Sequence, residues 1–276
     1  MLAPPHSPMD LQLKDRVVIV TGGARGIGAA ISSAFAAEGA RVAIVGRSPQ
    51  DGESLAREIS AAGGQAACFA CELTDAADLE RAVAAVRERF GPVAIVVNNA
   101  GVNDGVGLHS SVDDFRASLE RNLIHPFALV RLCLPDLIST RGCIINIGTK
   151  CSDTGQGGTS GYAAAKGGLN ALTREWALDL APHGIRANAV IPAEVMTPQY
   201  ERWISQRPDP AAALAAIEST IPLGGRMTTA REIADTVVFV ASARASHTTG
   251  QILYVDGGYV HFDRAVTVKN ASAASA

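Results

Sequence analysis

A tyrosine stands four residues ahead of a lysine in the stretch SGYAAAKGG, as Tyr162 and Lys166. If this stretch is helical, the two side chains lie on one face of the helix, one turn apart. At about 5 Å and an effective dielectric constant of 20, a lysine charge favours a nearby phenolate by roughly 3 kcal/mol. That is about two pKa units, which lowers the pKa of the phenol from 10 towards 8. Such a group is suited to general acid/base catalysis near neutral pH.

A tyrosine and a lysine at this spacing are common by chance, so the elements around them decide whether the pair is catalytic. Helical patterns that end in glycine, such as GAAISSAFAAEG and DLERAVAAVRERFG, alternate with short apolar runs typical of strands buried on both faces. This alternation predicts a single-domain α/β fold: a Rossmann-like, doubly wound, parallel seven-stranded sheet between two helical layers, α/β/α. The seven expected strands are RVVIVTGG, RVAIVGR, AACFACEL, VAIVVNNAG, GCIINIGT, IRANAVIPA and QILYVDGG.

The chain's 276 residues, 47% of them apolar, are enough for one large domain with a well-buried core. A formal net charge of −3 without blocks of like charge argues against a nucleic-acid partner, which normally meets a basic face. The sequence shows neither a signal peptide nor an uninterrupted apolar run of the roughly 18 residues that span a bilayer. We therefore expect a cytoplasmic protein with no membrane partner. The predicted domain is residues 13–263, with loose tails at 1–12 and 264–276.

The five cysteines are an odd number and show no disulfide pattern, so we expect reduced structural thiols. Cys68 and Cys71 form a C-x-x-C, but on a strand their side chains point to opposite faces. Cys151 lies near Tyr162 without metal-ligating neighbours in the sequence. No metal site is predicted.

The first predicted strand is followed directly by TGGARGIG and then by a helix. In a doubly wound sheet the ligand lies beyond the carboxyl ends of the strands. Glycines such as Gly22 and Gly28 let the backbone turn tightly and approach a pyrophosphate, whose charge then meets the helix N-terminus. The position favours a dinucleotide site over an ordinary tight turn.

The second strand ends in Gly46 and Arg47, where an NAD site usually has an acidic residue for the ribose 2′-hydroxyl. With Arg25 inside the glycine turn, two cations and no carboxylate would face a 2′-phosphate. We therefore predict NADP over NAD, the alternative being that both arginines are merely solvated. Glu72 and Leu73 follow the third strand and are expected to flank the adenine. Asn98, which ends the fourth strand, is assigned a structural role.

Four features stand in one order and spacing: TGGARGIG, NNAG at 98–101, Asn122 in ERNLIHPF, and the Tyr162/Lys166 pair. In these the chain resembles the short-chain dehydrogenase/reductase family, across roughly residues 13–260. The resemblance implies a nicotinamide enzyme in which Tyr162 transfers the proton and Lys166 lowers the pKa of Tyr162 and holds the nicotinamide ribose. It also implies that Asn122 holds a water in the proton relay. The family's serine, thirteen residues before the tyrosine, is here Thr149, which keeps the hydroxyl; Ser152 is an alternative donor at the wrong spacing.

The resemblance further implies which residues contact the dinucleotide. They are Gly22, Arg25, Ile27, Gly28, Arg47, Ser48, Glu72, Leu73, Asn99, Ala100, Gly101, Tyr162, Lys166, Pro192, Val195 and Thr197.

The sixth strand ends in IPAEVMT, where the family has Pro-Gly followed by a threonine that binds the nicotinamide carboxamide. Ala193 replaces that glycine. A lipid substrate would leave the polar groups expected near the site unpaired, at roughly 1–3 kcal/mol each, whereas a sugar would satisfy them. A sugar is therefore favoured, the alternative being that the carboxylates are solvated loop residues. The predicted substrate residues, beside Thr149, are Asn103, Asp104, Gln156, Glu194 and, as a wall, Trp203.

Segments such as NNAGVNDGVGL, TGQGGTSGY and VIPAEVMTPQYERWI resemble the bacterial L-fucose dehydrogenases within the family. This implies oxidation of the C1 hydroxyl of a free aldose to a lactone, with Tyr162 as general base. One alternative is a ketoreductase for 3-oxoacyl, steroid or other alcohol and ketone substrates, and a more distant one is a non-catalytic NADP-binding protein. The apolar segment ADTVVFVASARASHTTGQILYVDGGYV is expected to line a subunit contact, as in family homotetramers.

Overall fold

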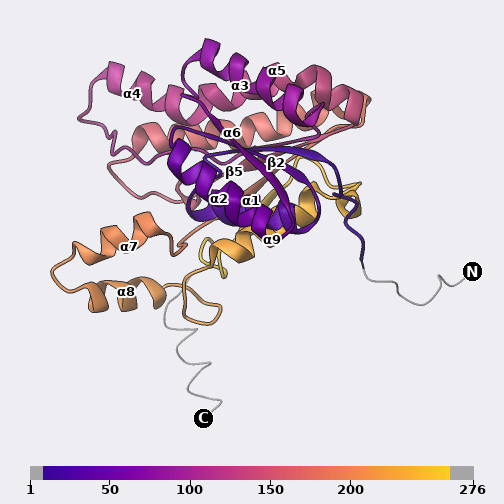
Figure 1. The fold of residues 1–276 in the computed structure, drawn as a ribbon. Coiled ribbons are helices and arrows are strands. Elements are labelled where there is room, and N and C mark those ends of the chain that lie inside the picture. The colour runs from indigo at the N-terminus through magenta and orange to yellow at the C-terminus, as the bar shows by residue number, and fades with distance from the viewer. Residues whose placement is uncertain (1–8, 262–276) are drawn as a thin grey trace, which may run out of the picture.

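A computed structural model of the chain describes residues 9–261, and its centre is one parallel seven-stranded sheet (Figure 1). The strand order is β3-β2-β1-β4-β5-β6-β7, which confirms the predicted fold class and all seven expected strands. The strands are β1 (Val17–Thr21), β2 (Arg41–Gly46), β3 (Gln65–Ala70), β4 (Ile95–Asn98), β5 (Cys143–Ile147), β6 (Arg186–Pro192) and β7 (Ile252–Val255).

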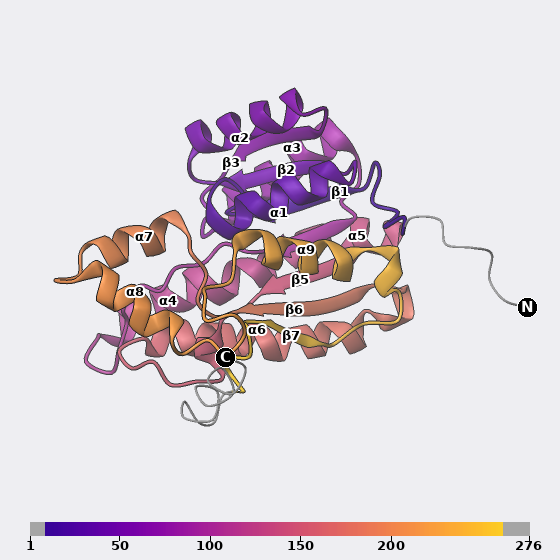
Figure 2. The same ribbon diagram turned by 90° about the horizontal axis from the view of Figure 1, so that it is seen from below.

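Helices cover both faces of the sheet (Figure 2). One face carries α1 (Gly26–Ala37), α2 (Pro49–Ala61) and α9 (Ala230–Ala241). The other carries α3 (Ala76–Phe90), α5 (His125–Thr140) and α6 (Ser160–Asp179). Because successive side chains of a strand alternate between faces, β1, which is apolar except for Thr21, contributes to both layers of the core.

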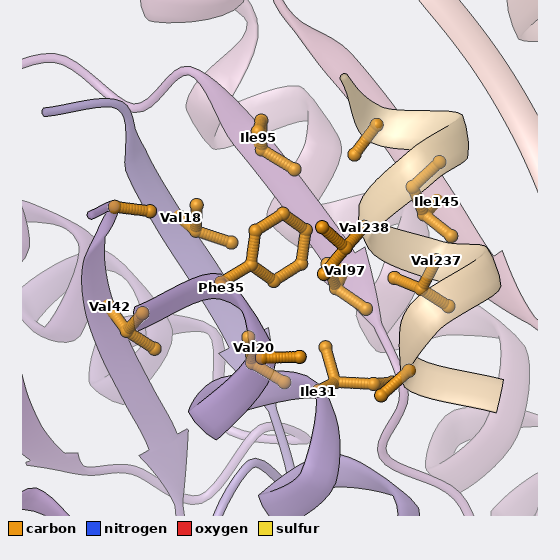
Figure 3. Packing of buried hydrophobic residues seen from close by; sticks show 14 of the residues in the cluster. Val18, Val20, Ile31, Phe35, Val42, Ile95, Val97, Ile145, Val237 and Val238 are labelled. Atoms are coloured by element: carbon orange, nitrogen blue, oxygen red, sulfur yellow. The ribbon is translucent and has the colours of Figure 1, made fainter. Parts of the chain in front are cut away.

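The core between the sheet and helices α1 and α9 shows this alternation directly. Phe35 on α1 lies fully buried at the centre of the cluster, against Val18 and Val20 of β1 and Val238 of α9 (Figure 3). The intervening Ile19 is buried in the cluster on the opposite face. Burying each such side chain contributes about 1.5–3 kcal/mol, so these layers hold the strand ends in fixed positions.

The winding of the sheet reverses between β1 and β4, which are parallel neighbours. A crevice opens at such a reversal beyond the carboxyl ends of the strands. Thr21, the last residue of β1, accepts the backbone N–H groups of Asn99 and Ala100 on its Oγ1, both at 3.0 Å. The Asn98 Nδ2 donates to Asn146 Oδ1 of β5 at 2.8 Å, as expected for a structural amide. Side chains thus hold the strand exits together.

One continuous helical run over residues 112–140 joins α4 (Val112–Leu119), a wide π-helical turn, η1 (Glu120–Ile124), and α5. By length and composition alone this run is apolar enough to cross a membrane, which the sequence interpretation did not anticipate. Its residues Leu129, Cys133 and Leu137 are fully buried against the sheet, so this part of the run belongs to the core.

Two short helices, α7 (Pro198–Ser205) and α8 (Pro210–Glu218), follow β6 and stand away from the main body (Figures 1 and 2). Thr197 begins α7, because its Oγ1 accepts the backbone N–H of Tyr200 at 3.2 Å. The pair lies at the end of the sheet where the crevice opens.

The described part of the predicted N-terminal tail contacts the domain. Arg244 Nε donates to the Asp10 carbonyl at 2.6 Å, and Leu11 packs against the core. Asp10 and Leu11 of the predicted tail thus lie against the domain, and the boundary at residue 13 stays a prediction. The remaining tail predictions fall on 1–8 and 264–276, which lie outside the described residues.

Candidate active site

A cavity of about 810 Å³ lies beyond the carboxyl ends of the strands. All sixteen residues that the sequence assigns to the dinucleotide line this cavity, as does Thr149. The residues come from the glycine turn, the exits of β2 to β6 and helix α6. The doubly wound topology thus gathers segments far apart in the chain around one space.

The glycine turn has the form of a pyrophosphate cradle. Gly22 adopts φ +61°, a left-handed conformation that favours glycine, and a Cβ on Gly28 would lie 2.2 Å from the Gly22 carbonyl oxygen. The N-cap residue of α1, Arg25, makes no side-chain capping bond, and the first turn has no acidic residue. The turn and the free N–H groups of α1 therefore fit a bound dinucleotide.

Both arginines of the predicted 2′-phosphate site have carboxylate partners. Arg25 Nη2 lies 2.7 Å from Asp51 Oδ2, and Arg47 Nη1 lies 3.8 Å from Glu72 Oε2. Bonds from Ser48 and then Arg25 also lower the pKa of Asp51. The expectation that no carboxylate is present was wrong, because Asp51 comes from α2 and Glu72 from the next strand exit, and both line the cavity.

Tyr162 and Lys166 lie on α6 and line the same cavity. Lys166 is almost wholly buried, and its Nζ donates to the Ile147 carbonyl oxygen at 2.8 Å. That bond ties the ammonium group to the end of β5. The two side chains therefore face one space, as the helical spacing predicts.

The predicted pKa of the tyrosine was wrong in direction. Burial, and after it the charge of Cys151, raises the pKa of Tyr162 to about 12. A hydrogen bond with Thr149 lowers this pKa, but by less than the other two effects raise it. Burial also lowers the pKa of Lys166 to about 8. The pKa expected from the sequence includes the attraction between the two groups but not the loss of water from both. This loss of water has the larger effect on the two pKa values.

Asn122 lies in the π-helical turn and is fully buried. Its Oδ1 accepts the Val102 N–H at 2.7 Å, and its Nδ2 donates to the carbonyl oxygens of Val102 and Ser118 at 3.1 and 3.0 Å. The side chain thus braces the segment after NNAG and does not itself line the cavity. Its role in a water relay stays a prediction.

Thr149 lies two residues after the end of β5; its Oγ1 accepts the Cys151 N–H at 3.4 Å, and its hydroxyl lowers the pKa of Tyr162. The alternative donor, Ser152, is engaged elsewhere: its Oγ donates to the Thr149 carbonyl at 2.7 Å and contacts Asp153 Oδ2 at 2.8 Å. Thr149 lines the cavity and Ser152 does not; that the Thr149 hydroxyl holds a substrate oxygen stays a prediction.

Thr149→Val is expected to lower kcat by about 10- to 100-fold, because the variant keeps the shape of the side chain and loses the donor. Thr149→Ser should retain activity, and Ser152→Ala should change kcat little. Steady-state kinetics of the three variants test the assignment, and full kcat in Thr149→Val would refute it.

Thr149 is the one predicted substrate residue that lines the cavity; the other five do not. Asp104 accepts from Arg121 at 2.7 Å and from Ser118 at 3.0 Å, and Gln156 Oε1 lies 2.7 Å from the Cys151 thiol. Asn103 is exposed, Trp203 packs against Tyr200, and Glu194 is held by Lys150 and Tyr200. Their contact with substrate stays a prediction.

The sequence interpretation did not name several residues that the fold brings to the site. Tyr200 and Arg202 of α7 line the cavity, as do Arg121 and His125. Burial, followed by the charge of Lys166, lowers the pKa of His125 to about 4, so this imidazole is neutral at physiological pH. The only signal for His125 in the sequence was its position three residues after Asn122.

All five cysteine thiols are free.

Comparisons with known proteins place this site in context. The chain matches the family described as Enoyl-(Acyl carrier protein) reductase over residues 22–260. It is 39% identical to L-fucose dehydrogenase of Mus musculus over 247 residues, covering 88% of each chain. It is 33% identical to 3-oxoacyl-(acyl-carrier-protein) reductase FabG of Thermotoga maritima, over 91% of this chain and 100% of the other. The solved structure of Cj0485 dehydrogenase superposes with a TM-score of 0.88 at 43% identity, covering 92% of this chain and 98% of the other.

Proposed function

The chain belongs to the short-chain dehydrogenase/reductase family, and we propose that it oxidises the C1 hydroxyl of a free aldose to the lactone. L-Fucose or a related sugar is the proposed substrate. Family membership makes the protein an oxidoreductase acting on CH–OH groups. The observation that carries the proposal is that Tyr162 and Thr149 line one cavity together with the polar side chains of Arg121, Tyr200 and Arg202.

In the proposed reaction Tyr162 removes the proton from the C1 hydroxyl while Thr149 holds that oxygen. A bound nicotinamide dinucleotide would supply the hydride acceptor. Lys166 keeps a positive charge near the phenol at neutral pH, which favours the phenolate form of Tyr162 that accepts the proton. The hydrogen bond from Thr149 acts in the same direction, because it lowers the pKa of Tyr162.

Polar groups next to the cavity support a sugar over a lipid. Lys150 and Glu194 form an ion pair, and Tyr200 donates to Glu194 at 2.7 Å. A fatty chain or a steroid against such groups would leave them without water or partners, whereas hydroxyl groups both donate and accept. The L-fucose dehydrogenase relative points in the same direction.

The test is a screen of NADP and NAD reduction by the purified protein with L-fucose, other aldoses, simple alcohols, a 3-hydroxyacyl thioester and a hydroxysteroid. We expect turnover with an aldose and the lactone as product, identified by mass spectrometry. Activity on the thioester or the steroid with none on any aldose would establish the ketoreductase alternative. Cofactor binding without turnover of any compound would establish a non-catalytic NADP-binding protein.

We propose NADP as the preferred cofactor, with Arg25 and Arg47 turning from their carboxylate partners to the 2′-phosphate. The two side chains are 69% and 76% exposed, and ion pairs this exposed contribute about 0–1 kcal/mol, so a phosphate can replace them. Arg47→Asp is expected to shift the ratio of kcat/KM for NADP over NAD by at least about 10-fold towards NAD. Asp51→Asn should shift it the other way. Equal use of both cofactors, unchanged in Arg47→Asp, would contradict the assignment.

We also propose a cytoplasmic homotetramer that uses the predicted apolar segment. Strand β7 is at an edge of the sheet with all four residues only partly buried, and Phe239 on α9 is 45% exposed. Light scattering of the purified protein is expected to give four times the chain mass of 28.5 kDa, and a monomer would contradict the proposal.

A further inference from the structure

Four polar side chains from separate segments form a cluster beside Thr149. Lys150 follows Thr149, Glu194 follows β6, Tyr200 lies on α7, and Tyr259 lies in the C-terminal turn. The Lys150 Nζ pairs with Glu194 Oε1, and the Tyr200 hydroxyl donates to Glu194 Oε2 at 2.7 Å. The same Nζ lies 4.1 Å from the centre of the Tyr259 ring.

The cluster is largely enclosed and carries no net charge. The side chains of Lys150 and Glu194 are only 14% and 12% exposed. Burial alone would lower the pKa of Lys150, but the hydrogen bond and charge of Glu194, with the contact to Tyr259, raise it overall. Burial and Glu194 likewise raise the pKa of Tyr200. At neutral pH the cluster therefore holds a charged lysine and a protonated tyrosine.

The cluster lies next to the cavity. Thr149, immediately before Lys150, lines the cavity, and so do both sequence neighbours of Glu194, Ala193 and Val195, whereas Lys150 and Glu194 themselves do not. Tyr200 of α7, whose hydroxyl donates to Glu194, also lines the cavity. The Lys150–Glu194 pair is therefore bonded directly to a residue of the cavity wall.

The pair suits a hydroxyl group and not a carboxylate. An ammonium group has three donors, and a carboxylate has acceptor sites beyond those that Lys150 and Tyr200 use, so a hydroxyl can bond to both members of the pair. A substrate carboxylate can only accept, and it would lie beside the charge of Glu194 or separate Glu194 from Lys150. Separating an enclosed ion pair leaves a charge uncompensated, which is strongly unfavourable.

We propose that the ion pair between Glu194 and Lys150 keeps the ammonium group from binding a substrate carboxylate, so that the pocket admits uncharged sugars and rejects sugar acids. The inference rests on the proposed function, because it names the ionic class of that same substrate. It also fits the proposed product. Hydrolysis of an aldose lactone adds water across the ester bond and gives a sugar acid, and a pocket that rejects this acid escapes inhibition by it.

The experiment is calorimetric titration of L-fuconate into the enzyme saturated with NADP, for the wild type and Glu194→Gln. We expect no measurable binding to the wild type and at least about 10-fold tighter binding to Glu194→Gln, in which Lys150 is free to meet the acid. The double variant Lys150→Met/Glu194→Gln should lose this gain, because the cation is gone. The matched control is Glu201→Gln, which removes the same charge from an exposed position on α7 and should gain nothing.

Two results overturn the proposal: equal L-fuconate affinity in the wild type and Glu194→Gln, or the same gain in Glu201→Gln. Lys150→Met supplies an independent test, because it leaves Glu194 charged and unpaired. We expect at least about 10-fold weaker L-fucose binding and no gain for L-fuconate in this variant, and unchanged L-fucose binding would also overturn the proposal. A wild type that oxidises no aldose refutes the proposed function instead, and the L-fuconate comparison does not depend on turnover.

Discussion

Tyr162→Phe is expected to lower kcat by about 100-fold or more, the effect of removing a general acid/base. The variant keeps the ring that lines the cavity and loses only the hydroxyl that exchanges the proton. Dinucleotide binding, measured by fluorescence titration, should change little, because the glycine turn and the arginines are untouched. Tyr254→Phe on β7 is the matched control and should keep wild-type kcat, since Tyr254 does not line the cavity.

The pH dependence of the reaction rates is a second test of the role of Tyr162. A general base works in its deprotonated form, and the pKa of Tyr162 is raised to about 12. Oxidation by the wild type should therefore become faster as pH rises from 6 through the alkaline range, whereas reduction of the carbonyl product should change little until the pH approaches 12, because Tyr162 stays in its acid form. In Tyr162→Phe the residual rate should lose this slope. A variant with wild-type kcat, or with the same slope, would show that another group moves the proton.

The backbone of the site could be predicted because its signals are local. The glycine turn, the mostly apolar strands and the spacing of Tyr162 and Lys166 each lie within a few residues, and the parallel topology then brings the strand exits together. All sixteen predicted dinucleotide contacts line the cavity for this reason. Local pattern and global fold agree at these positions.

The electrostatics of the site could not be predicted, because they depend on pairs that are remote in the chain. Glu194 is separated from Lys150 by 44 residues, and Asp51 reaches Arg25 from the next helix. Neither partner can be inferred from one segment of sequence. The predicted pKa of Tyr162 was wrong for a related reason, since the extent of burial is a property of the assembled fold rather than of a helical spacing.

Lys166→Met is expected to have opposite effects on activity and stability. Activity should fall by about 100-fold or more, because the charge that favours the phenolate form of Tyr162, the general base, is lost. Stability at pH 7 should rise, because Lys166 is buried and its one hydrogen bond, to Ile147, is to a neutral carbonyl. Lowering its pKa from 10.5 to about 8 corresponds to a cost of about 3 kcal/mol for the charged form in the folded state. The lost hydrogen bond offsets about 1 kcal/mol of the gain.

The sign of the pH effect identifies the cause. Below pH 8 the lysine is charged in both states, and the folded wild type carries the full cost of the buried charge. Between pH 8 and 10.5 the unfolded chain binds more protons than the folded one, so the wild type recovers stability as pH rises. The advantage of Lys166→Met in urea denaturation should therefore be largest near pH 7 and shrink towards pH 10, whereas the exposed Lys14→Met should show no such trend. A Lys166→Met protein that is less stable than the wild type at pH 7 would mean that the lysine holds the fold together, and its loss of activity would then say little about catalysis.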